Sequence, residues 1–432
     1  MQQMLEKTAE RLCVAVTSDW PKTAMNSIEL SVTTGFDGAS GYVNPQQKFY
    51  DEENDDRSPY QSLFVCGALI IQLKSLSNPK YLWNNPTPQS YRFFRPLKIA
   101  HQKEDNEMAL EEYNRLGEEI KHLKPFKFTM GKGVTVMVEF SVSRTLFDGK
   151  NVNAIVGNKA TQRCPMCLIT SHNFNNQNVF IPKEGSLSHG LGLLHCEIKI
   201  FDHLLHIAYK QEVKVWDVTK NIKESVDLYA GQVRDRLYNA FKIRVDQVIQ
   251  GKGTSNNGNL ARKFLDRPKD FANALDIDEE LVCNLATITK VYRSALEIEV
   301  EELKKFSDFT YKLHYIKYPW ARMNPSMHKI LQHGPDIVRQ FPMPVAFYAE
   351  DALESMHKIH RETIREHSRR NSRENAILDT FNRAVYLSDP ILSMVYLDRR
   401  REMHKKRPLT NDITRFLKPG QWTDPEDRSN ED

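Results

Sequence analysis

Apolar and polar positions alternate strictly in two segments of the first third of the chain. In residues 27–37 the apolar positions include Ile28, Leu30 and Val32, and in residues 134–142 every second residue is Val or Phe. A period of two puts these side chains on one face of a strand, where a sheet buries them. The pattern therefore predicts two strands, and the same tripeptide, Phe-Asp-Gly, follows within both regions.

Three further elements are expected between these strands. Residues 63–73 form a short apolar run, residues 91–100 have the composition of a strand, and NEMALEEYNRLGEEIKHL at residues 106–123 has the period of a helix. An acidic stretch at residues 51–57 is expected to be a loop. Strands and a helix in this order predict a sheet domain of the α/β class.

The chain changes character after Cys167, where most segments have apolar residues at helical spacing. A break rich in Gly, Ser and Asn interrupts these helices at residues 250–259, and a final long helix is expected from about Pro344 to Arg373. We therefore expect five segments: a lead-in at 1–26, a sheet core at 27–160, a helical insertion at 161–343, a basic helical region at 344–400 and a largely disordered tail at 401–432.

Composition narrows the class of protein. The chain has 432 residues, 40% of them hydrophobic, which is enough to form two or three cores. Its net charge of +4 indicates no particular partner, so charge matters only where it clusters. The N-terminus lacks the apolar core of a signal peptide, no apolar run is long enough to cross a bilayer, and six cysteines are too few for a disulfide scaffold. These features predict a soluble intracellular protein with reduced thiols.

The two Phe-Asp-Gly tripeptides put Asp37 and Asp148 at the ends of the predicted strands, where a glycine permits close approach of the backbone. Taken alone, each Asp-Gly is better explained by an ordinary turn. Two carboxylates on neighbouring strands repel each other unless a cation lies between them, and Mg²⁺ prefers oxygen ligands. The pair therefore favours a metal site, which for phosphoryl transfer on two cations needs a third carboxylate.

Glu354 is the better candidate for the third carboxylate. On a helical wheel Glu354, Lys358, Arg361 and Arg365 fall in one narrow arc, so one helix face offers an acid in line with three cations. A solvated face with ion pairs between acidic and basic residues explains the same spacing. Glu197 is a weaker candidate, because it lies in an amphipathic helix where a solvated surface position is expected.

Four residues have the types and spacings of a tetrahedral zinc site. RCPMC contains Cys164 and Cys167 at the C-x₂-C spacing, and MHKILQH contains His328 and His333 with four residues between them. Two thiolates and two imidazoles make a closed ligand set, which stabilises a fold and does not catalyse. A redox pair is the competing interpretation of the cysteines, and it predicts that Cys167→Ser abolishes activity without unfolding the chain.

Several short segments of the sequence, taken in order, resemble the catalytic core of the Transib DNA transposases and of their relative, the catalytic subunit of the vertebrate V(D)J recombinase. They extend from about residue 31 to residue 393. The segments are TTGFDGASG, RPLKIAHQKED, LFDGKNVNAIVGNKATQRCPMC, LGLLHCEIKIFDHLLHIAY, GKGTSNNGNLARKF, MHKILQHG, and AEDALESMHK with the later REHSRRNSR and SDPI.

This resemblance implies an α/β fold in which an RNase H-like mixed sheet domain is interrupted by a large, mostly helical, zinc-stapled insertion. It implies an Asp-Asp-Glu site on Mg²⁺ or Mn²⁺ that nicks double-stranded DNA at transposon ends, forms hairpins on flanking DNA by transesterification and transfers strands. Such an enzyme is expected to act in the nucleus as a homodimer. The implied catalytic residues are Asp37, Asp148, Glu354 and Glu104; the zinc ligands are Cys164, Cys167, His328 and His333; and Asn257, Asn259, Arg262, Lys263, Lys358, Arg361 and Arg365 are expected near DNA.

The chain departs from the family before its first strand. Relatives carry an N-terminal region that binds terminal repeats and supports dimerisation, whereas only about 26 residues precede the first strand here. The alternative hypothesis is therefore a domesticated or truncated transposase core that binds DNA or partner subunits without cleaving.

Overall fold

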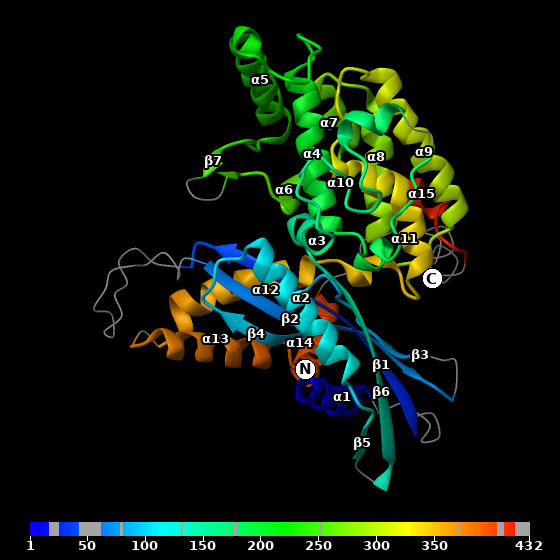
Figure 1. The fold of residues 1–432 in the computed structure, drawn as a ribbon, viewed down its shortest axis with the longest axis vertical. Helices are drawn as coiled ribbons and strands as arrows, with labels where there is room; N and C mark the ends of the chain where they lie inside the picture. Colours follow the sequence, from blue (N-terminus) through cyan, green and yellow to red (C-terminus); the bar gives the residue numbers. More distant parts are fainter. Residues whose placement is uncertain are drawn as a thin grey trace. The chain divides into compact units, whose positions relative to one another are not determined.

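The computed structural model describes residues 1–16, 26–42, 62–77, 81–130, 133–176, 179–249, 253–369, 371–403 and 410–419. The acidic stretch at residues 51–57 lies outside these ranges. The chain divides into two compact units. The first contains Met1–Gly157 and Phe347–Lys406, and the second contains Asn158–Ala346 and Arg407–Asp432. The colours of Figure 1 show that the first unit combines the blue and cyan start of the chain with orange segments near its end.

A mixed, mostly antiparallel sheet forms the base of the first unit (Figure 1). Its strands pair in the order β3–β2–β1–β6–β5, and β4 also pairs with β2. β1 runs antiparallel to β2 and parallel to β6. The two strands predicted from alternation correspond to β1 and β6. The strands are β1 (Ser27–Ser40), β2 (Ser62–Ser75), β3 (Tyr81–Asn84), β4 (Phe94–Ala100), β5 (Phe126–Thr129) and β6 (Thr135–Leu146).

Helices cover this sheet and explain the continuous apolar run in β2. Leu63, Val65 and Leu69 share a core with α12 and α13, whereas Phe64 and Cys66 share another with α2 and α3. A strand that is buried on both faces has no polar alternation. The helices of this unit are α1 (Gln2–Val16), α2 (Asn106–Lys121), α3 (Gly149–Ile155), α12 (Asp351–Glu362), α13 (Arg373–Leu387) and α14 (Pro390–Met403).

The single long helix expected from Pro344 to Arg373 is wrong. The short 3₁₀ turn Val345–Tyr348 comes first, and α12 begins only at Asp351. After α12 the π-helical turn Thr363–His367 follows, and then the backbone becomes extended at Ser368. A π turn holds more residues per turn than an α-helix, so Arg365 leaves the arc that it shares with Glu354 on an ideal wheel.

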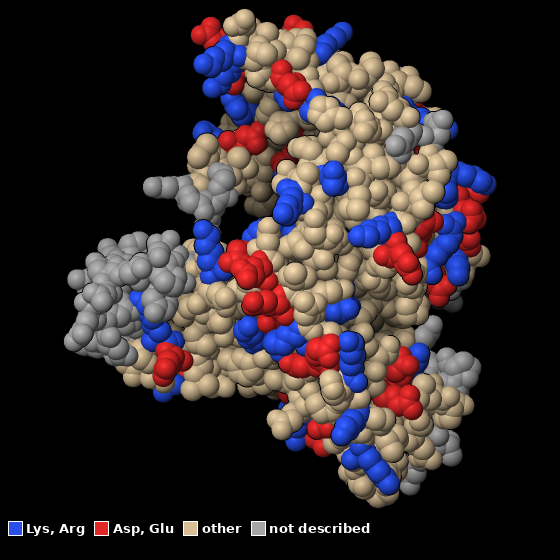
Figure 2. Space-filling view, in the orientation of Figure 1, with Lys and Arg blue, Asp and Glu red and all other residues tan. Residues whose placement is uncertain are grey.

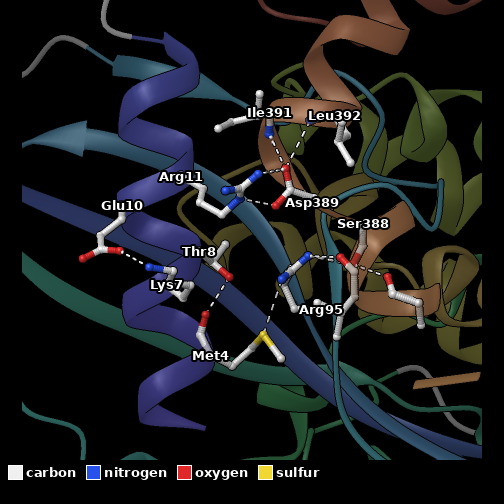
Figure 3. Close-up of polar contacts among 12 residues, drawn as sticks. Met4, Lys7, Thr8, Glu10, Arg11, Arg95, Ser388, Asp389, Ile391 and Leu392 are labelled. Atoms are coloured by element: carbon white, nitrogen blue, oxygen red, sulfur yellow. Dashed lines mark hydrogen bonds and ion pairs between the residues drawn. The ribbon is translucent and has the colours of Figure 1, made fainter. Parts of the chain in front are cut away.

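The expected lead-in at residues 1–26 contains α1, whose Leu5, Ala9 and Leu12 are buried in a core with the sheet. A polar network joins α1 to the C-terminal helices (Figure 3). Arg11 forms a two-pronged ion pair with Asp389, in which Nη2 and Oδ1 are 2.9 Å apart. Arg95 is buried and donates to the Val385 carbonyl oxygen at 2.7 Å and to Ser388 Oγ at 3.0 Å. Asp389 Oδ1 also accepts from the backbone N–H groups of Ile391 and Leu392, at 3.1 and 3.2 Å, where α14 begins.

Asp389→Ala is expected to destabilise the protein by about 2–4 kcal/mol, because it removes a helix cap and leaves a half-buried Arg11 unpaired. Urea unfolding measures the change. Glu10→Ala is the matched control, since Glu10 forms an exposed pair with Lys7 on the same helix (Figure 3). The control should change stability by less than about 1 kcal/mol. Equal effects of the two substitutions would contradict a stabilising role for Asp389.

The second unit is mostly helical, as expected, and α4 packs against several of its other helices. Its helices are α4 (Leu193–Tyr209), α5 (Lys220–Phe241), α6 (Gly258–Leu265), α7 (Pro268–Leu275), α8 (Glu279–Arg293), α9 (Val300–Lys317), α10 (Pro325–His328), α11 (Gly334–Gln340) and α15 (Asn411–Thr414). Its shorter elements are the 3₁₀ turns Ser171–Asn176 and Ser186–His189, the strands β7 (Val248–Ile249) and β8 (Gly253–Thr254), and the π-helical turn Lys329–His333. The described helices are all too short or too polar to span a membrane.

One expectation about this unit is wrong, and a second fails for part of its range. Glu197 is 3% exposed and not on the surface, because it pairs with Arg262 and Arg293, so that two guanidinium groups compensate the buried charge of its carboxylate. Residues 410–419 of the expected disordered tail fold, since Ile413, Phe416 and Leu417 are buried. Residues 401–403 belong to α14, and the rest of that segment lies outside the described residues.

A pair of buried histidines makes this unit sensitive to acid. His203 and His314 are joined by a hydrogen bond of 2.9 Å between their Nε2 atoms, so one ring donates and the other accepts. Burial lowers the pKa of His314 to about 3 and that of His203 well below its usual value. The unfolded chain therefore takes up these protons near pH 6.5 while the folded chain does not. Stability is complete above pH 6.5 and falls as the pH drops toward 3.

The expected loss is about 1.4 kcal/mol per pH unit for His314. Chemical unfolding at pH 7.5, 6.5 and 5.5 measures it. His314→Gln, which cannot titrate, should lose less stability than the wild type between pH 6.5 and 5.5, whatever the other histidines contribute. Identical pH slopes for the two proteins would show that the histidine pair does not set the acid sensitivity.

Candidate catalytic and metal sites

Asp37 and Asp148 stand at equivalent positions relative to two paired strands. β1 and β6 run parallel, and the last residue pair of their ladder is Gly35 with Leu146. Each aspartate lies two residues beyond that pair, so both come from the same edge region of the sheet. The strands approach so closely there that a Cβ on Gly35 would lie 2.0 Å from the Leu146 carbonyl oxygen. Only glycine fits at this position.

The phenylalanines that precede the aspartates join the two tripeptides. Phe36 and Phe147 are buried, and their ring centroids lie 5.0 Å apart in an edge-on arrangement. Aromatic pairs of this geometry stabilise a structure by about 0.5–1.5 kcal/mol beyond their buried area. The contact holds the residues after β6 against β1. The two Phe-Asp-Gly tripeptides therefore pack together through their phenylalanines.

The strands do not end on the aspartates as expected. β1 continues past Asp37 to Ser40, because Asp37 pairs with Val65 of β2 on its other side. β6 stops at Leu146, and Asp148 instead caps α3 by accepting from the backbone N–H of Asn151 at 2.7 Å. Asp37 is 9% exposed and Asp148 is half-buried. One carboxylate thus comes from a rigid strand and the other from a helix N-terminus.

Glu104 lies between the two aspartate-bearing segments and binds donors of this chain. It accepts from the Gly38 backbone N–H at 2.7 Å, from Lys150 Nζ at 2.7 Å and from Asn151 Nδ2 at 3.1 Å. A Cβ on Gly38 would lie 2.5 Å from the Cβ of Glu104, so this glycine makes room for Glu104. Glu104 therefore ties β1 to α3. The glycine of the second tripeptide, Gly149, faces open space.

Glu354 is half-buried on α12, which packs on β1, β2 and β4. One turn later His357 is fully buried, with Nε2 at 3.2 Å from Asp37 Oδ2 and Nδ1 at 2.7 Å from the Tyr42 hydroxyl oxygen. Burial lowers the pKa of His357 to about 4, and the charge of Glu354 opposes part of that shift. Burial raises the pKa of Tyr42, and the charges of Asp37 and Glu354 raise it further. Both acids therefore act on the same buried pair of side chains.

Asp37, Asp148 and Glu354 are brought into one compact unit. Among the described residues, their carboxylate oxygens do not form a group that lies within 4.8 Å of one another. Like charges repel, so a cation is needed to draw such carboxylates closer. The set offers only hard oxygen ligands, which is the chemistry that Mg²⁺ and Mn²⁺ prefer.

Cys164, Cys167, His328 and His333 form a group that can hold a metal ion. One ligand atom from each of them lies within 4.8 Å of all the others. Cys167 Sγ and His328 Nε2 are 3.5 Å apart, and three of the four residues are buried. Neither ring nitrogen of His333 has a hydrogen-bond partner among the described residues. Buried imidazole nitrogens without partners fit a metal-ligand role.

Local backbone features assemble this group. A tight turn after the first cysteine is closed by the Leu168 N–H, which donates to the Cys164 carbonyl oxygen at 2.8 Å. Leu168 adopts a left-handed conformation with φ of 60°. His328 ends α10 and His333 ends the π-helical turn that follows it. π turns inside helices often occur at functional sites, and this one carries a candidate ligand at its end.

The charges in the group suit metal binding. Hydrogen bonding to Cys164 lowers the pKa of Cys167, and His328 and His333 lower it further. Burial lowers the pKa of His328, which keeps that imidazole neutral. A thiolate and neutral imidazoles are the forms that bind metal. Burial raises the pKa of Cys164, so in the absence of a cation this thiol keeps its proton.

Comparison with models of known protein families gave no match, and comparison with curated proteins gave no significant match. The chemistry of both sites therefore has to be inferred from their own residues.

The residues expected near DNA divide into two sets. Asn257 caps α6 by accepting from the Leu260 N–H at 3.1 Å, and Arg262 pairs with Glu197 at 2.9 Å, so both are used within the protein. Asn259 and Lys263 are exposed one turn apart on α6. In the first unit, Lys358 is exposed, Arg361 lies 5.2 Å over the Tyr42 ring, and the exposed Arg365 pairs with Glu366 at 2.6 Å. Figure 2 shows basic and acidic side chains intermingled on the displayed face.

Sequence reasoning missed the residues that surround the aspartates. Tyr42, Lys150, Asn151 and His357 contact Asp37, Glu104 or one another through side chains. Lys150 and Asn151 follow Asp148 directly, so their proximity to the site was available as a signal. Tyr42 and His357 gave no signal, because their contact joins a residue just after β1 to a helix more than 300 positions later.

Proposed function

We propose that this protein is a divalent-cation-dependent DNA nuclease and strand transferase of the Transib transposase class, with an RNase H-like catalytic unit. The main support is that Asp37 and Asp148 each lie two residues beyond the last pair of the parallel β1–β6 ladder, while the helix of Glu354 reaches Asp37 through His357. Three acidic residues from distant parts of the chain thus belong to one compact unit. Its partners would be double-stranded DNA and a second copy of the chain, in the nucleus.

Asp37, Asp148 and Glu354 would hold Mg²⁺ or Mn²⁺. When bound, such cations activate water or a 3′-hydroxyl and neutralise the charge that builds up on the phosphate. Asp37 and Glu354 supply carboxylates from a strand and a helix, which are rigid supports. Glu104 keeps β1 and α3 together and so fixes the distance between the two aspartates. We therefore assign Glu104 a positioning role, because its oxygens already accept three hydrogen bonds.

We also propose that zinc occupies the group of Cys164, Cys167, His328 and His333. Two thiolates and two imidazoles complete a tetrahedral shell and leave no position for water, so the ion would stabilise the second unit without catalysing. Phosphate contacts would come from three cations, namely the exposed Lys358 and the half-buried Arg361 beyond Glu354, and the exposed Lys263 on α6. Such contacts hold DNA without reading its sequence.

Divalent-dependent nicking of supercoiled plasmid DNA tests the proposed function. The purified chain should convert supercoiled to open-circular DNA in Mg²⁺ or Mn²⁺ and should not do so in a metal chelator. DNA binding is measured in parallel by mobility shift. Binding without nicking in either metal would favour the alternative of a domesticated or truncated core. That alternative draws on one observation: among the described residues, the oxygens of these three carboxylates do not form a group that lies within 4.8 Å of one another.

A further inference from the structure

We propose that His357, held by Tyr42, is a positioning residue that orients the Asp37 carboxylate and fixes the helix that carries Glu354. The inference rests on the proposed function, because it treats Asp37 and Glu354 as cation ligands. It extends that function by identifying the side chain that fixes the position of Glu354 on α12 relative to Asp37 on β1, although the two residues are distant in sequence.

Two contacts connect Tyr42 in the hydrophobic core to the Asp37 carboxylate through His357. Tyr42 is 6% exposed and shares a core with Leu353 and Met356 of α12. Its hydroxyl lies 2.7 Å from His357 Nδ1, and His357 Nε2 lies 3.2 Å from Asp37 Oδ2. The second contact has the length of a hydrogen bond but not its alignment, since Nε2 has no hydrogen-bond partner by angle. A small rotation of the carboxylate completes it.

The partners determine where the protons lie. A neutral imidazole has one N–H, and its other nitrogen presents a lone pair. A lone pair that faced the Asp37 carboxylate at 3.2 Å would be repelled, so the N–H is on Nε2. Nδ1 must then accept from the Tyr42 hydroxyl, which lies farther, at 3.3 Å, from the His357 carbonyl oxygen. The Tyr42 hydroxyl therefore donates to His357, and the His357 N–H faces Asp37.

This arrangement also fixes Glu354. Residues three apart on an α-helix share a face, so Glu354 and His357 project from the same side of α12. Because His357 is held between Tyr42 and Asp37, the helix can neither rotate nor slide along β1 without breaking a buried contact. Glu354 is therefore kept at a constant position relative to Asp37.

Direct binding of a cation by His357 is the competing role. It requires the lone pair on Nε2 and other ligands close to it. Among the described residues, no third acid, cysteine or histidine joins Asp37 and His357 in a group within 4.8 Å. The observed geometry therefore favours a donor that acts on Asp37.

Binding of Mn²⁺ to the full chain without DNA, measured by calorimetry, tests this role separately from catalysis. Asp37→Asn identifies the signal that belongs to this site. His357→Leu should weaken that signal by about 10–100-fold, the range found for residues that orient metal ligands. His357→Gln keeps a donor near the Nε2 position and should stay within about threefold of the wild type. Tyr42→Phe should weaken binding less than His357→Leu, by about 3–10-fold.

His360→Leu is the matched control, because His360 is equally buried on the same helix, its ring centroid is 6.3 Å from that of His357, and neither of its ring nitrogens has a hydrogen-bond partner among the described residues. It should leave Mn²⁺ affinity unchanged. Thermal unfolding of every variant separates loss of fold from loss of binding. If His357→Leu does not fold, Tyr42→Phe decides, since it removes one hydroxyl and keeps the buried ring.

Three results would overturn the inference. Normal Mn²⁺ affinity in both His357→Leu and Tyr42→Phe, with Asp37→Asn defective, would remove the positioning role and leave the proposed function intact. A His357→Gln variant as defective as His357→Leu, with an altered preference between Mg²⁺ and Mn²⁺, would make His357 a direct ligand. The absence of any Asp37-dependent Mn²⁺ signal in the wild type would overturn the proposed function together with this inference.

Discussion

Asp148→Asn is expected to lower the rate of DNA nicking at least about a thousandfold, equivalent to about 4 kcal/mol of transition-state stabilisation. The substitution isolates charge from structure. Asp148 caps α3, and Asn accepts the same backbone hydrogen bond nearly as well as Asp. The variant should therefore fold normally but lack the negative charge that a hard cation requires. Nicking of supercoiled plasmid in Mg²⁺ and Mn²⁺, with thermal unfolding of the same samples, measures both effects.

Asp105→Asn provides the matched control. Asp105 caps α2 in the same way, by accepting from the Met108 N–H at 2.9 Å, but it is exposed, and four residues separate it from the preceding strand β4. Its nicking rate should equal that of the wild type. If Asp148→Asn also nicks at the wild-type rate, Asp148 does not bind a catalytic cation and the proposed acidic site is wrong.

Removal of zinc is expected to unfold the second unit. Structural zinc contributes about 10–16 kcal/mol of apparent binding free energy in small domains, which is comparable to the whole stability of a folded domain. Without the ion, His333 and His328 bury ring nitrogens that lack partners. Elemental analysis should find one zinc per chain, and a chelator should lower the unfolding temperature by more than about 10 °C. Zinc added back should restore it.

Cys164→Ser should have the same effect as the chelator, because serine is a poor zinc ligand and Cys164 is buried. Cys283→Ser is the control, since Cys283 is a half-buried cysteine of α8 in the same unit and outside the candidate zinc group. If Cys164→Ser has the same unfolding temperature as the wild type, a structural zinc site at this cysteine is ruled out. The redox interpretation would gain support only if Cys167→Ser abolished activity while the fold remained intact.

The two candidate sites differed in how far the sequence could describe them. For the zinc group, residue type and spacing named all four members, because C-x₂-C and paired histidines bring ligands together over a short stretch of backbone. For the acidic site, the repeated tripeptide named Asp37 and Asp148 but not the contact that unites them. The packing of Phe36 on Phe147 depends on β1 and β6 being neighbours, and alternation alone does not specify strand order.

Periodicity in the sequence determined the strands at 27–37 and 134–142, the helix of residues 106–121 and the helical character of the second unit, because local burial imposes a period on local residues. Only the tertiary structure decided the roles of three charged or polar residues. Glu197 is buried between two arginines, Glu104 is saturated by donors from Gly38, Lys150 and Asn151, and His357 meets Asp37. The charge state and partners of a side chain depend on what the fold brings beside it. Contacts between residues that are distant in the chain produce no periodic pattern in the sequence, so periodicity cannot predict them.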